Sequence, residues 1–183
     1  MELAKIGSPA SVCGKIEVKK ASGQHNHVAP GVAKYTDAPP TNGDHVATPD
    51  TIDRKLYTTK DRPALEVLVH NLEHGYTIVW YDDTVPKDSE QWAELRAFAR
   101  KLNSKTNFRM KFKVAPWTSK DGKAFPSGQH IAFTHWSHGN AKDDQDRTAE
   151  MGITQYCSKP SGAALKDFMQ KYPYLDSPEP TVP

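Results

Sequence analysis

Regular hydrophobic periodicity is confined to the middle of this 183-residue chain, and that restriction most constrains its fold. Residues 1–62 contain many helix and strand breakers, among them the run DAPPTNGD. Within this part only GKIEVKK (14–20) and GVAKY (31–35) alternate well enough to predict short strands. We therefore expect residues 1–62 to form a long, mostly irregular N-terminal arm that wraps a core.

Residues 63–172 carry the periodic pattern and are expected to form that core. Helical spacing predicts helices at 63–74, from Ser89 to about 102, and at 161–172; strands are predicted within 77–83, 109–116 and 129–138. The last strand carries bulky apolar residues on both faces, which indicates a central position.

This order of elements predicts an α+β fold, with a single mixed β-sheet of three to five strands and packed helices. A thioredoxin-like fold has the same element order, although this chain has no redox motif. We expect one domain over residues 1–183, with residues 173–183 as a Pro-rich tail.

Charge and hydropathy exclude several classes of partner. The net charge is +2 and both signs are interspersed, so nucleic acid is not an expected partner. No apolar run approaches the roughly 20 residues that span a bilayer, so no transmembrane segment is expected in this chain. The first residues, MELAKIGSPAS, also lack the features of a secretion signal. Either the protein is cytosolic, or the chain begins after a signal or anchor has been removed.

Cys13 and Cys157 lie near opposite ends of the chain and form no CxxC motif. A bridge between them would close a loop of about 145 residues and contribute about 4–5 kcal/mol to stability. It would also indicate an oxidising compartment. The alternative is a pair of unrelated buried thiols.

Two histidines, His70 and His74, are four residues apart on the first predicted helix, so their rings lie on one face within reach of a common ion. Neutral imidazole is a usual ligand of zinc and copper. A rigid turn in PPTNGDH could hold His45 against the end of this helix, and His27 could supply a fourth nitrogen. Alternatively, the helical pair only interacts with the helix dipole.

The other candidate ligands are less favoured. His135 shares a strand face with apolar residues and is expected in the core, whereas His130 and His138 are expected at the surface. Three methionines that could bind copper are expected to pack in the core: Met110, Met151 and Met169.

The residues HNLEH also fit the H-x-x-E-H pattern, in which two histidines hold zinc and the glutamate activates water. That motif needs a long helix, whereas Gly75 is expected to end this one. Glu73 could instead orient a histidine.

The segments HVAPGVAKY, APPTNGDH and LVHNLEHGYTIVWY together resemble the uncharacterised bacterial family DUF3105, whose members carry PPTSG-x-H followed by VHNLEHG. The resemblance covers residues 25–137, with Asn42 where the family usually has serine. It implies an extracytoplasmic location behind a signal or a membrane helix, and it implies no activity. Carried over residue by residue, the resemblance picks out His27, His45, His70, Glu73 and His74, and it does not pick out His25, His130 or His138.

The sequence therefore predicts an extracytoplasmic protein that binds one transition-metal ion, copper in preference to zinc, for delivery or storage. The expected ligands are His45, His70 and His74, with His27 as the fourth. A membrane-bound or periplasmic protein is the expected kind of partner for delivery, and an enzyme is not favoured. Two alternatives remain open: a zinc-dependent hydrolase with Glu73 as general base, and a metal-free interaction module whose histidines bond the loops to the core.

Overall fold

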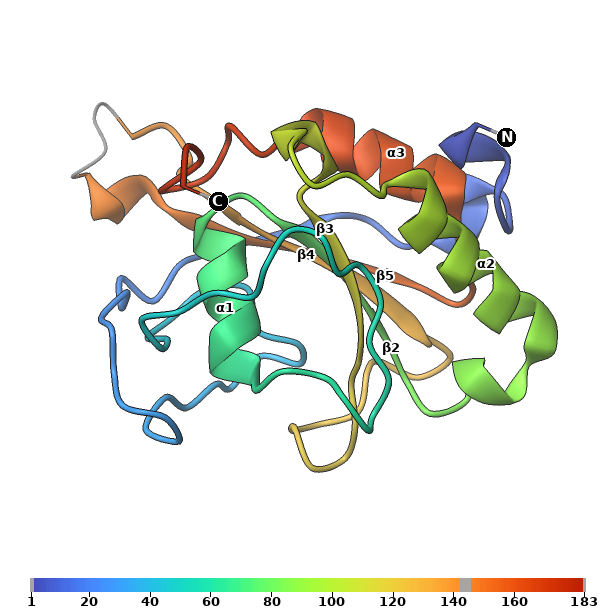
Figure 1. Ribbon diagram of the computed structural model, residues 1–183, viewed down its shortest axis with the longest axis horizontal. Helices are drawn as coiled ribbons and strands as arrows, with labels where there is room; N and C mark the ends of the chain where they lie inside the picture. The colour runs from blue at the N-terminus through green and yellow to red at the C-terminus, as the bar shows by residue number, and fades with distance from the viewer. Residues whose placement is uncertain (1, 142–145, 183) are drawn as a thin grey trace.

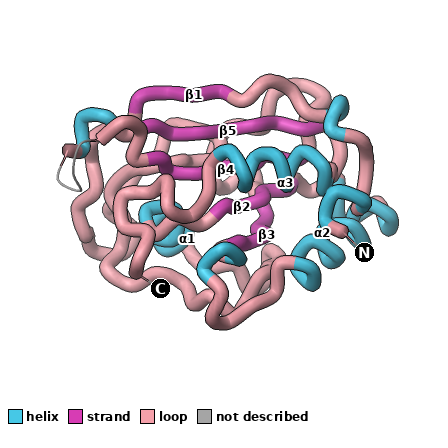
Figure 2. The backbone as a smooth tube through the Cα atoms, turned by 90° about the horizontal axis from the view of Figure 1, so that it is seen from above, coloured by secondary structure: helices cyan, strands magenta, loops and turns pink. Residues whose placement is uncertain are grey.

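The computed structural model describes residues 2–141 and 146–182 and contains one five-stranded mixed sheet. The strands lie in the order β1-β5-β4-β2-β3, as Figure 2 shows from above. Strands β2 and β3 are parallel and the other neighbours are antiparallel. The bounds are β1 Glu17–Lys20, β2 Thr77–Tyr81, β3 Phe112–Pro116, β4 Ile131–Ser137 and β5 Met151–Cys157. The expected α+β fold with a mixed sheet is confirmed.

Three helices cover the two faces of this sheet (Figure 1). Helices α2 (Ser89–Lys101) and α3 (Gly162–Lys171) share one apolar cluster with alternate residues of the strands, including Phe133. Helix α1 (Leu65–Glu73) packs on the other face, in a second cluster that includes Trp136. Because successive side chains of a strand point to opposite faces, β4 is apolar on both sides and buried along its whole length. Its predicted central position is confirmed.

The elements differ from the sequence expectation in two places. Strand β5 was not predicted, because MGITQYC lacks a clear apolar alternation; it forms through pairing with both β1 and β4. The segment GVAKY is irregular, and its Gly31 N–H donates to the Glu66 carboxylate of α1 at 2.7 Å. Helix α2 begins at Ser89 as expected, and the Asp88 side chain before it caps the helix by accepting hydrogen bonds from two backbone N–H groups.

The N-terminal arm is bound to the sheet by a disulfide between Cys13 and Cys157. This pairing joins the arm to the end of β5 across 144 residues of sequence. Disulfides persist in oxidising compartments, so the bond is consistent with a location outside the cytoplasm. Among the described residues, no helix combines the length and apolar character that crossing a membrane requires.

The C-terminal tail packs against the end of α1. The N–H of Glu179 donates to the carbonyl oxygen of Glu73 at 3.0 Å, and the Lys111 ammonium donates to the Pro180 carbonyl at 2.9 Å. Gly75 ends α1 with a φ of +90°, and a Cβ there would lie 2.3 Å from the carbonyl oxygen of Tyr174. The glycine therefore permits both the turn and the close approach of the tail.

Candidate metal centre

Four side chains from three segments converge beside α1. These are His27 from the arm, His45 from the PPTNGDH loop, and His70 and Glu73 from α1. Their potential donor atoms all lie within 4.8 Å of one another. The rings of His45 and His70 have centroids 4.5 Å apart, and the His27 ring lies 5.2 and 5.0 Å from them. Three segments that are distant in the sequence thus meet at one point.

Backbone pairing places the two loop histidines. His27 and His45 form a parallel β-bridge, in which the Val28 N–H donates to the His45 carbonyl at 2.8 Å. The His45 N–H in turn donates to the Asn26 carbonyl at 3.0 Å. This pairing explains why two irregular segments can hold imidazoles at fixed positions.

Backbone carbonyls fix the tautomers of two imidazoles. His45 Nδ1 lies 2.8 Å from the Gly43 carbonyl oxygen, and His70 Nδ1 lies 2.7 Å from that of Val46. A carbonyl oxygen only accepts hydrogen bonds, so each Nδ1 carries a proton and donates it. In the neutral rings Nε2 therefore bears the lone pair that can bind a metal. The lone pair of His70 Nε2 accepts a hydrogen bond from His74 Nε2 at 3.0 Å.

One of these lone pairs faces a buried carboxylate. His45 Nε2 lies 3.0 Å from a Glu73 carboxylate oxygen, and both side chains are almost fully buried. The contact lacks the direction of a hydrogen bond, and within the described structure this nitrogen has no hydrogen-bond partner. Two electron-rich atoms this close need a proton or a cation between them. The arrangement thus fits either a protonated His45 or a metal ion held by the four donors.

The charges of the cluster shift the pKa of each group. Burial alone lowers the pKa of His45, but the neighbouring Glu73 and the Gly43 carbonyl raise it above its ordinary value. Burial raises the pKa of Glu73, yet His45 and Arg147 bring it below the ordinary value. Burial, with positive charge on His45 and His74, lowers the pKa of His70 to about 4. His70 is therefore a neutral imidazole near pH 7.

His74 belongs to a neighbouring group with Glu73 and Glu179, rather than to the group that holds His45. Its Nε2 lies 3.0 Å from His70 Nε2 and 3.6 Å from a Glu179 carboxylate oxygen. The two groups share Glu73.

Arg147 adds a positive charge between the carboxylates. Its guanidinium lies 2.9 Å from Glu150, 3.5 Å from Glu179 and 3.6 Å from Glu73. Glu150 also accepts a hydrogen bond from Trp136 Nε1 at 2.9 Å. With neutral histidines, three carboxylates and one guanidinium give this set a net charge of −2.

Sequence reasoning missed Arg147, Glu150 and Glu179. No motif marks them, since they lie just before β5 and in the Pro-rich tail. Only the packing of those segments around α1 brings them to the histidines. Gly75, which the sequence marks as the end of the helix, also leaves room for the tail in the structure.

Asn71 holds the loop that orients His70. Its side-chain amide donates to the Asp50 carbonyl at 2.7 Å, and its side-chain oxygen accepts from the Asp50 N–H at 3.0 Å. Asn71 is fully buried. The loop between Val46 and Asp50 is thereby bound to α1, so the motif residue between the candidate ligands has a positioning role.

Three other histidines contact aspartate residues that belong to neither donor group. His135 is fully buried, with Nε2 2.8 Å from the Asp176 carbonyl oxygen, which confirms the expected core position. His130 and His138 are partly exposed; the first contacts Asp82 at 2.7 Å and the second contacts Asp176 at 3.7 Å.

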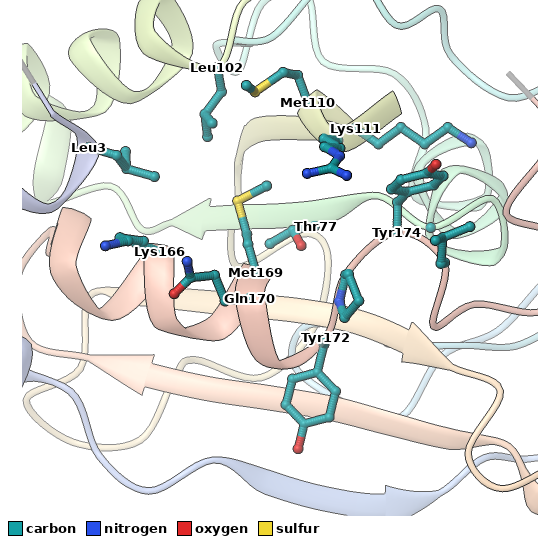
Figure 3. A pocket seen from close by; sticks show the side chains of 14 residues that line it. Leu3, Thr77, Leu102, Met110, Lys111, Lys166, Met169, Gln170, Tyr172 and Tyr174 are labelled. Carbon is teal, nitrogen blue, oxygen red and sulfur yellow. The ribbon is translucent and has the colours of Figure 1, made fainter. Parts of the chain in front are cut away.

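A cavity of about 520 Å³ lies between α3, the start of the tail and the segment before β3 (Figure 3). Met110 and Met169 are among its lining residues, and no histidine is. Lys111 also lines this cavity, and its ammonium donates to the carbonyl oxygen of His74 at 2.7 Å. The cavity therefore lies beside the histidine cluster but is not lined by its histidines.

Comparison with known proteins yields one match. The model of the family described as "Protein of unknown function (DUF3105)" matches residues 27–183, which include every candidate donor in both groups. No match was found among curated proteins or among solved structures. Because the family model covers most of the chain, the chain belongs to the DUF3105 family.

Proposed function

We propose that this protein binds one divalent transition-metal ion through His27, His45, His70 and Glu73. The observation that carries the proposal is the buried Nε2 of His45. It has no hydrogen-bond partner among the described residues, and the proton on Nδ1 directs it to a carboxylate oxygen of Glu73 3.0 Å away. Metal–ligand bonds of about 2.0–2.2 Å place donor atoms at most about 4.4 Å apart. The donors here lie within 4.8 Å, so small side-chain rotations suffice.

Charge supports a single dication. The three carboxylates and Arg147 that surround the donors carry a net charge of −2 when the histidines are neutral. One divalent ion neutralises this set, whereas burying the uncompensated negative charge is costly.

The donor chemistry supports copper(II) ahead of zinc. The set consists of imidazole nitrogens and a carboxylate, and both cysteines are in the disulfide. Sites of this kind bind divalent first-row metals in an order that places copper(II) above zinc.

The location of the site supports a cargo ion rather than a structural ion. His27 is exposed while its partners are buried, so the ion would be reachable from the surface. The disulfide already restrains the arm. We therefore propose metal delivery or storage outside the cytoplasm, with a membrane-bound or periplasmic protein as recipient.

A hydrolase would use Glu73 differently. A general base does not bind the ion itself; it removes a proton from a water molecule that the ion binds. Here the Glu73 carboxylate lies within the donor group and contacts His45, which favours a ligand role. Glu73→Gln should therefore weaken metal binding; a hydrolase predicts that the variant keeps its metal and loses turnover.

Elemental analysis and calorimetric titration of untagged protein test the proposal. We expect one equivalent of copper(II) or zinc, and a loss of at least about 100-fold in affinity for His45→Ala and His70→Ala. His130→Ala is the matched control, because that histidine binds Asp82 away from the cluster. Full affinity in both cluster variants, or no binding by the native protein, would reject the proposal and leave the metal-free interaction module.

A further inference from the structure

The two donor groups share one candidate ligand, and a histidine of one group lies next to a histidine of the other. Glu73 belongs to both groups, and the Nε2 atoms of His70 and His74 are 3.0 Å apart. We call His27, His45, His70 and Glu73 the inner group, and Glu73, His74 and Glu179 the outer group. An ion bound by the outer group could pass to the inner group by exchanging His74 for His70 while Glu73 stays bonded.

The outer group offers a carboxylate to solvent. The Glu179 side chain is 41% exposed, whereas those of His74 and Glu73 are 3% exposed. Glu179 can therefore bind a hydrated ion at the surface, and the buried side chains of His74 and Glu73 can bind it next. Carboxylates and imidazoles both bind divalent transition metals, so each position of the path suits the same ion.

The tail holds Glu179 in place without an ion. Its backbone N–H is bonded to the Glu73 carbonyl, and Lys111 donates to the carbonyls of Pro180 and Val182 just beyond it. Arg147 contacts both Glu179 and Glu73, but its shortest contact is with Glu150 at 2.9 Å. It can therefore remain on Glu150 when an ion occupies the outer group.

Charge argues against two ions at once. The surrounding carboxylates and Arg147 carry a net charge of −2, so two divalent ions would leave an excess of +2 in a largely buried site. The shared carboxylate also cannot serve both positions fully. The geometry therefore favours occupation of the two groups in turn.

We propose that His74 and Glu179 form an entry and exit position, through which a single divalent metal ion exchanges between solvent and the inner histidine site. This inference rests on the proposed function. The exchange is ligand substitution at constant oxidation state. The proton that His74 Nε2 donates to His70 Nε2 leaves to solvent when His74 binds the ion, and it returns when the bonds to His74 and Glu179 break and bonds to His70 and His45 form. It assigns His74 a transient role, in place of the permanent one that the sequence suggested.

Stopped-flow mixing with copper(II) alone tests the proposal. The Trp136 ring lies 6.1 Å from the His45 ring, so quenching of tryptophan fluorescence should report occupation of the inner site. Release is measured by mixing the loaded protein with excess chelator. We compare native protein, Glu179→Gln, His74→Gln and the matched surface control Glu90→Gln on α2.

An entry position lies on the path in both directions, so its loss slows uptake and release together. We expect Glu179→Gln to slow both by about tenfold while the equilibrium affinity changes less than about threefold. His74→Gln should behave similarly, and Glu90→Gln should match native protein.

Unchanged rates in Glu179→Gln, or two equivalents of copper bound by native protein, would overturn the entry position. Faster release with unchanged uptake would make Glu179 an ordinary ligand and would also overturn it. These outcomes leave tight binding by the inner site intact. If native protein binds no copper, the proposed function fails and this inference fails with it.

Discussion

Replacing Asn71 by alanine should weaken both the fold and the metal site. Asn71 is fully buried, and its two hydrogen bonds satisfy the N–H and the carbonyl of Asp50. A buried polar group left unpaired costs about 1–3 kcal/mol. Because Asp50 is only half-buried, water can satisfy part of this loss, and we expect about 2–4 kcal/mol in total.

The same change should act on the metal through His70. Asn71 holds the loop that begins at Val46, whose carbonyl orients the His70 ring. Loss of groups that orient a metal-binding histidine typically costs 10–100-fold in affinity, and we expect about that factor here.

Urea unfolding and copper titration of Asn71→Ala measure these two effects. Asn103→Ala is the control, since Asn103 is exposed and its side chain makes no hydrogen bond to the described residues. A loss below about 0.5 kcal/mol, the usual range for surface substitutions, would refute the positioning role of Asn71. So would native copper affinity in the variant.

Three further predictions concern the disulfide, the glycine after α1 and the titration of His70. Replacing Cys13 and Cys157 by serine should lower the free energy of unfolding by about 4–5 kcal/mol, measured in urea with the reduced native protein as control. Gly75→Ala should destabilise more than Gly128→Ala, because both glycines have positive φ but only the first would meet the tail backbone; equal losses in thermal melts would contradict this. In the folded protein the pKa of His70 falls from 6.5 to about 4. Between these pH values the unfolded chain binds a proton that the folded chain lacks, so the metal-free protein should lose up to about 3 kcal/mol as the pH falls from 6.5 to 4. Unfolding of His70→Asn over this range should lack that loss, and identical pH profiles would show that His70 does not titrate in this way.

Periodic segments of the sequence predicted their own structure well. The helices and strands of the core follow from apolar spacing, and the central position of β4 follows from its two apolar faces. Strand β5 could not be predicted in the same way, because its residues extend the sheet through backbone pairing with β1 and β4. Its stability comes from its neighbours rather than from its own pattern.

The candidate site was partly predictable for a similar reason. Helical spacing placed His70 and His74 on one face, and the turn residues of PPTNGDH indicated a rigid position for His45. The spacing could not show that Nε2 of His74 would also lie near Glu179, since that residue reaches the site through the packed tail.

The five residues of the motif could not show how Glu73 is placed. In the structure its carboxylate belongs to both candidate donor groups. Its burial and its contact with His45 come from the packing of distant segments, which the motif does not encode.

Anomalous diffraction at the copper absorption edge, from crystals grown with copper(II), tests the central claim most directly. We predict one strong peak among His27, His45, His70 and Glu73, about 2.0–2.1 Å from Nε2 of His45 and of His70. Both Nδ1 atoms should keep their carbonyl partners, Gly43 and Val46. No peak at this cluster, or an ion bound through Nδ1 of either ring, would contradict the account.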